Sequence, residues 1–123
     1  IRSALAEEGV IRLLMLDPAL WRELEQLPPE DFSSPLLAKA YRLLFRRARE
    51  GLSTQFDVLT EDLTSGEMAH LAAVVEKPES LSNRHRSLAD YIAVIQEEAL
   101  KRSGISIDDL LLAAQKKFSK QQS

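Results

Sequence analysis

The sequence contains no cysteine in 123 residues, which excludes disulfide bonds, thiolate nucleophiles and cysteine zinc sites and fits a reducing compartment. It also has no long apolar run, since the most apolar stretch, VIRLLML, covers seven residues and includes Arg12. A membrane-spanning helix needs about twenty apolar residues, so we expect no membrane partner. The chain starts without methionine and without a signal-peptide pattern, and we expect a piece of a longer, cytoplasmic protein.

Residues that carry catalysis are equally scarce. His70 makes a single Glu-x-x-His with Glu67, on the expected solvent face of its helix, whereas di-iron bundles use that unit twice. The other histidine, His85, lies in NRHRS, which is typical of a solvated helix start, and neither histidine has an identifiable orienting carboxylate. The four glycines are scattered, so no glycine-rich loop can cradle a phosphate. We therefore predict a chain that is not an enzyme, with no metal site and no cofactor.

Charge gives no global signal, because a net charge of −3 favours neither nucleic acid nor an anionic membrane. Paired acids such as Glu7 and Glu8 are expected in first helical turns or on polar faces, where they complement the helix dipole. The basic run YRLLFRRARE predicts a solvated helix face with local ion pairs; a contact for an acidic partner or nucleic acid is the alternative. Tyr41 falls on the buried stripe of that helix, so we expect no base-stacking platform.

Helix-period spacing dominates the sequence, and no stretch alternates apolar and polar residues like a half-buried strand. Start signals combine a capping side chain with proline or with a capping box, and stop signals combine glycine and proline. The starts are Asp17-Pro18, Ser34-Pro35 and the Thr64/Glu67 box, and the stops are Gly51, Pro78 and Gly104. This pattern predicts an all-α fold with helices near residues 3–16, 18–26, 35–50, 55–63, 65–77, 84–103 and 107–120.

The segment EKPESLSN is the best candidate for a linker within the chain. It divides a small helical bundle, residues 1–80, from the last two helices, residues 81–123. Because only the short turn around SGI joins those two helices, they are expected to run antiparallel as a helical hairpin.

The predicted hairpin carries more apolar side chains than one buried stripe accounts for. On the helix near 84–103, the stripe consists of Leu88, Tyr91, Ile92, Ile95 and Ala99 and spans about 100°. Val94 and Leu100 point more than about 100° away from it, and Leu112 lies off the stripe of the last helix in the same way. Such residues can pack against the bundle, contact a partner or stay exposed to solvent. Together they form a candidate surface for binding a partner.

Four stretches of the chain carry a family likeness: EEGVIRLLMLDPALWREL, PPEDFSSPLLAKAYRLLFRRAREG, DYIAVIQEEALKRSGIS and LLAAQKKFSK. In these stretches, which extend over nearly the whole chain, the sequence resembles the C-terminal helicase-interaction domain of bacterial DnaG-type primases. That domain is a helical bundle followed by a terminal helical hairpin, so the resemblance implies the same all-α architecture.

The resemblance also implies a function. The chain would be a non-catalytic domain that docks primase on the N-terminal collar of the replicative hexameric helicase and couples primer synthesis to the replication fork. The main contact would come from the hairpin, and direct nucleic-acid binding is not expected. Within the hairpin we predict partner-binding residues that insert into a groove with a charged rim. These are Val94, Leu100, Leu112, Lys116 and Phe118.

A related family leaves an alternative open. LMLDPALWREL and YIAVIQEEALKR also resemble the N-terminal domain of the DnaB-type replicative helicase, which is built on the same small bundle. That reading predicts self-association together with primase binding. A helical nucleic-acid-binding module on the arginine face is a further alternative, and it predicts DNA binding that weakens steeply with salt.

Overall fold

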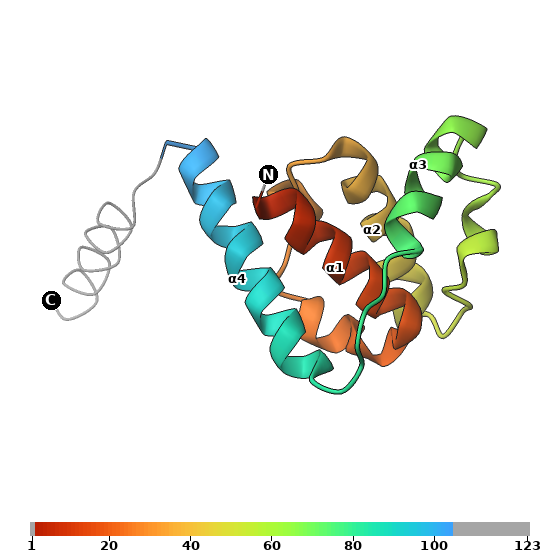
Figure 1. Ribbon diagram of the computed structural model, residues 1–123, viewed down its shortest axis with the longest axis horizontal. Coiled ribbons are helices and arrows are strands. Elements are labelled where there is room, and N and C mark those ends of the chain that lie inside the picture. The colour runs from red at the N-terminus through yellow and green to blue at the C-terminus, as the bar shows by residue number, and fades with distance from the viewer. Residues whose placement is uncertain (1, 105–123) are drawn as a thin grey trace, which may run out of the picture.

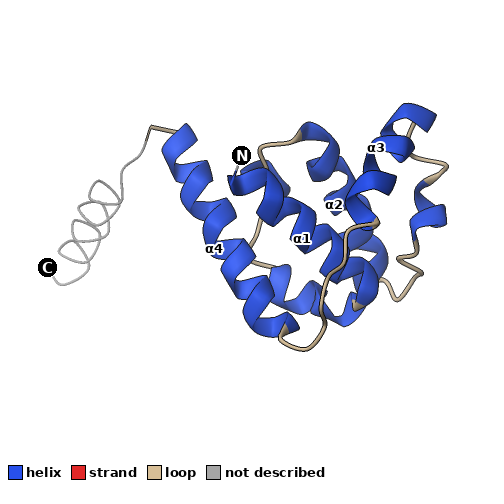
Figure 2. Cartoon of the chain, viewed as in Figure 1, coloured by secondary structure: helices blue, strands red, loops and turns tan. Residues whose placement is uncertain are grey.

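The computed structural model describes residues 2–104, and these residues contain four α-helices and three short 3-10 helices with no strand (Figures 1 and 2). In chain order the elements are α1 (Arg2–Leu16), η1 (Pro18–Leu24), η2 (Pro29–Asp31), α2 (Pro35–Arg49), η3 (Phe56–Leu59), α3 (Ser65–Val75) and α4 (Arg84–Arg102). The predicted all-α fold is confirmed. The second helix of the expected hairpin, near residues 107–120, lies outside the described residues.

Helix α1 is the centre of the molecule and contacts α2, α3, α4 and η1 (Figure 1). Its second half explains why: Val10, Ile11, Leu13 and Leu14 are all fully buried. At about 100° per residue these four side chains spread over about 160° of the helix surface, and Arg12 lies on the side left between them. An apolar arc wider than a single stripe needs more than one neighbouring element to cover it.

The predicted start and stop signals are mostly confirmed. The Ser34 hydroxyl accepts a hydrogen bond from the Leu37 N–H at 3.2 Å, which caps α2. At the start of α3, Thr64 and Glu67 exchange hydrogen bonds of 3.1 and 2.9 Å as a complete capping box, and the N–H of Thr64 lowers the pKa of Glu67. Gly51 ends α2 with a φ of 75°, in the left-handed region that favours glycine.

Two of the predicted helices are shorter and of a different type. The helices expected near 18–26 and 55–63 are 3-10 helices, Pro18–Leu24 and Phe56–Leu59. Asp17 makes no capping hydrogen bond; its carboxylate lies 2.9 Å from Arg84 Nε instead. Because an ion pair with another element competes with the local cap, the Asp-Pro signal located the start of η1 without predicting its geometry.

The expectation that Glu7 lies on a polar face is wrong. Its side chain is fully buried and accepts four hydrogen bonds, one from the Ser3 hydroxyl and three from the segment that precedes α2. Those three donors are the N–H and hydroxyl of Ser33, at 2.9 and 2.7 Å, and the N–H of Ser34, at 3.0 Å. Glu7 therefore holds the start of α2 against α1.

Helix α4 lies along α1, and this is the most extensive helix–helix contact in the described part of the chain. Leu88 and Ile95 of α4 are fully buried in the same core as the residues of the bundle. The Tyr91 ring covers Gly9, where an added Cβ would lie 2.3 Å from the ring. The first helix of the expected hairpin is thus part of the bundle core, and the division into residues 1–80 and 81–123 stays a prediction.

Candidate functional site

The two predicted contact residues that the structure describes, Val94 and Leu100, have different surroundings. Val94 is half-buried and packs against the apolar core. Leu100 is also half-buried, but it lines an open groove in the C-terminal half of α4. The structure does not bring them together as one exposed patch. The other three predicted residues, Leu112, Lys116 and Phe118, lie outside the described residues.

Val94 is partly covered because α4 has neighbours on two sides. Along one side it contacts α1, and Glu98 approaches Arg2 of α1 at 3.8 Å. Along the other side, Gln96 donates a hydrogen bond of 3.3 Å to the carbonyl of Gln26, just beyond η1, and α4 also contacts η2. A helix between two elements is covered over a wider arc than the single stripe that sequence periodicity predicts.

The open groove beside Leu100 has a volume of about 360 Å³ and is also lined by Ala99, Gln96, Ser103 and Asp31. Two of these residues, Ala99 and Leu100, offer apolar surface near the C-terminal end of α4. Arg102 donates a hydrogen bond of 2.7 Å to the Asp31 carbonyl oxygen, which joins the end of α4 to η2. Partial burial raises the pKa of the Asp31 carboxyl, while the charge of Arg102 opposes that rise.

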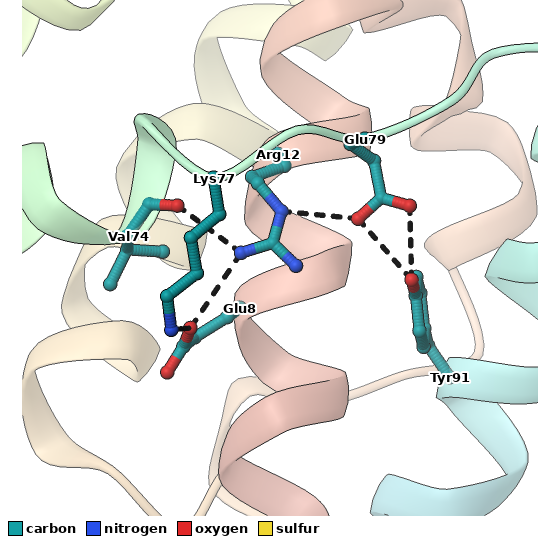
Figure 3. A network of polar contacts seen from close by, with 6 residues as sticks. All are labelled: Glu8, Arg12, Val74, Lys77, Glu79 and Tyr91. Atoms are coloured by element: carbon teal, nitrogen blue, oxygen red, sulfur yellow. Dashed lines mark hydrogen bonds and ion pairs between the residues drawn. The ribbon is translucent and has the colours of Figure 1, made fainter.

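A polar network fixes the first half of α4 (Figure 3). Arg12 of α1 donates from Nε to Glu79 at 3.1 Å, and the Tyr91 hydroxyl of α4 donates to the same carboxylate at 3.0 Å. Both charged side chains are nearly buried, with 11% and 9% exposed, so this ion pair is shielded from solvent. Burial and then the Glu79 carboxylate raise the pKa of Tyr91.

Further contacts extend the network to α3 and to the connection between α3 and α4. Arg12 also donates to the Val74 carbonyl at 3.2 Å and lies 3.6 Å from Glu8, which in turn pairs with Lys77 at 3.0 Å (Figure 3). The expected linker is therefore tied to α1 on one side and to α4 on the other. Sequence reasoning missed this network, because Arg12 appeared only as a charge that interrupts an apolar run.

The two histidines lie on the surface. His70 is exposed on α3, and His85 is exposed at the start of α4. The Nδ1 of His85 lies 2.7 Å from the Glu23 carboxylate, a neighbour 62 residues away that the sequence did not identify. Within residues 2–104, no group of three or more histidine, cysteine, aspartate or glutamate side chains is arranged to hold a metal ion. None of the helices described is both long and apolar enough to cross a membrane.

Comparison with known proteins adds no relative: no family model, no curated protein and no solved structure matches this chain.

Proposed function

We propose that this chain is a non-catalytic protein-interaction domain of a bacterial primase, which docks on the replicative hexameric helicase and couples primer synthesis to the fork. The proposal rests on the resemblance of four stretches of the sequence to the helicase-interaction domain of bacterial primases. The helical bundle is compatible with that resemblance. The partner surface would comprise the C-terminal half of α4 and the residues that follow it.

One structural observation supports this placement above the others. Helix α4 is anchored over its first three turns by the buried Leu88 and Ile95 and by the Tyr91 hydroxyl, whereas Leu100 near its end lines an open groove. A rigid helix end with an apolar side chain at the rim of a groove is the geometry that helix-in-groove recognition uses. Because these contacts hold α4 in place, its C-terminal half loses little conformational entropy when a partner binds.

The test measures binding of the full chain to the isolated N-terminal domain of the replicative hexameric helicase by isothermal titration calorimetry. Leu100→Asp places a charge in the contact, and we expect the affinity to fall by about tenfold or more, equivalent to about 1.4 kcal/mol. Leu112→Asp, in the predicted second helix of the hairpin, is expected to weaken binding in the same way. Circular dichroism should show an unchanged melt for Leu100→Asp, since this side chain is outside the buried core.

Leu81→Asp is the matched control, because Leu81 is 37% exposed in the connection before α4 and receives the same substitution. It should bind like the unmodified chain. Equal affinity for Leu100→Asp and Leu81→Asp would contradict the proposed surface, and absence of any heat with the unmodified chain would contradict the proposed function. Rings or dimers of the isolated chain in analytical ultracentrifugation would favour the helicase N-terminal domain instead.

A further inference from the structure

A second groove borders η2 on the side of α2 and is formed by residues that the proposed helicase contact does not use. It has a volume of about 320 Å³ and lies between α2 and the chain from Leu24 to Pro29. Leu24, Leu27 and two consecutive prolines supply one apolar wall. The Tyr41 side chain, which is buried and donates to the Leu27 carbonyl at 2.8 Å, belongs to the floor.

Three arginines form the rim of this groove on the α2 side. Arg42, Arg46 and Arg49 follow the spacing i, i+4, i+7, so they lie on one face of α2, and all three are exposed. Arg42 approaches Glu30 at 3.6 Å, in a pair that is largely exposed and therefore weak. Arg46 and Arg49 make no ion pair within residues 2–104, which leaves two guanidinium groups available to a ligand.

Aromatic side chains also contribute to this groove. Phe45 lines the groove and is half-buried, and its ring lies 5.8 Å from the Arg49 guanidinium. The Trp21 ring meets Phe45 edge-on with 6.1 Å between centroids. Tyr41 is stacked on Phe32 at 4.6 Å, so its face is already covered. Phe45 lies in the same basic run as Tyr41, but its place beside the groove has no signal in the sequence.

We propose that this groove binds an acidic peptide segment of another protein, with one aliphatic side chain inserted beside Phe45 and carboxylates paired to Arg46 and Arg49. Guanidinium groups bind carboxylates through two parallel hydrogen bonds, which suits an array of arginines beside an apolar slot. Nucleic acid fits less well, because sequence-tolerant binding relies on free aromatic faces for stacking. Tyr41 is buried against Phe32, and the Arg49 guanidinium lies over the Phe45 ring.

The chain contains a built-in probe for this proposal, since Trp21 is its one tryptophan and contacts the groove residue Phe45. The full chain is titrated with a short synthetic peptide of aspartate and glutamate residues around one central leucine. We expect a saturable change of Trp21 fluorescence. The anisotropy of the fluorescein-labelled peptide should rise with the same dissociation constant. Replacing the leucine of the peptide with serine should weaken binding by about tenfold or more, because the apolar slot then stays unfilled.

Charge reversal on the rim supplies the second arm. Arg46→Glu should weaken peptide binding by about tenfold or more and reduce its dependence on salt. Arg86→Glu is the matched control, because Arg86 is an exposed helical arginine on α4 and the change in net charge is identical. Both variants should melt like the unmodified chain, since neither arginine is buried.

Three outcomes would overturn the proposal: no saturable binding up to about 1 mM peptide, equal weakening by Arg46→Glu and Arg86→Glu, or tighter binding of an oligothymidylate than of the peptide. The experiment needs no helicase, so its failure and the failure of the proposed docking function are distinguishable.

Discussion

At the scale of single residues, buried Glu7 shows how a local reading of charge can mislead. In the sequence it is one of two adjacent acids near the start of a helix, a pattern that usually indicates a solvated first turn. In the structure it satisfies the N–H groups of Ser33 and Ser34, which lie 26 and 27 residues later in the chain. No helical period encodes that contact, because its donors come from the backbone of another element.

We expect Glu7→Ala to lower the free energy of unfolding by about 3 kcal/mol or more, because it leaves buried donors at the start of α2 without an acceptor. Urea denaturation followed by circular dichroism measures the change. Glu61→Ala is the control, since Glu61 is exposed, and it should stay within about 0.5 kcal/mol of the unmodified chain. Equal effects of the two substitutions would show that the Glu7 hydrogen bonds add no net stability.

At the scale of elements, the contact between α1 and α4 depends on a residue that helix propensity disfavours. Gly9 lies in the middle of α1, where glycine costs about 1 kcal/mol relative to alanine. Its lack of a side chain lets the Tyr91 ring approach the α1 backbone and brings the Tyr91 hydroxyl to Glu79. The sequence predicted the stripe of α4 correctly at Leu88 and Ile95, but the hollow in α1 that receives Tyr91 has no periodic signal.

Gly9→Ala should therefore destabilise the fold although it improves helix propensity. The added Cβ would lie 2.3 Å from Tyr91 Cε2, so the ring must move, and we expect a net loss of about 1–3 kcal/mol. Thermal denaturation provides the measurement.

Gly66→Ala is the matched control for that prediction. Gly66 lies in α3, and the nearest atom to an added Cβ there is 4.0 Å away, so the substitution should raise stability by up to about 1 kcal/mol. If Gly9→Ala also raised the melting temperature, the close approach of α1 and α4 would not be a stabilising feature. The double variant Gly9→Ala/Tyr91→Ala should lose less than the sum of its parts, because the clash is then removed.

At the scale of the whole molecule, the sequence predicted what local rules control. The all-α class, the capping box at Thr64 and the stop at Gly51 follow from contacts within a few residues of each other. The 3-10 geometry of η1 and η3 and the network around Arg12 depend on elements that meet only after folding, and they were missed. The candidate site divides in the same way: Leu100 lies at an open groove, as an off-stripe residue can, while Val94 is partly covered by neighbours that periodicity does not reveal.

The position of α4 makes the extent of the folding unit testable. Leu88 and Ile95 are fully buried in the core that residues 2–75 share, and burying two such side chains contributes about 3–6 kcal/mol. Small domains have only about 5–15 kcal/mol of total stability. Truncation at residue 80 also uncovers the side of α1 that α4 covers, so the shortened chain should lose its cooperative thermal transition. A chain that ends at Gly104 retains the buried Leu88 and Ile95 together with the rest of this core, so it should melt cooperatively, close to the full chain. Differential scanning calorimetry of the two truncations decides between the boundaries. A cooperative melt for residues 1–80 would support an autonomous bundle that ends before α4. Loss of the transition in residues 1–104 would show that the last nineteen residues of the sequence are needed for folding.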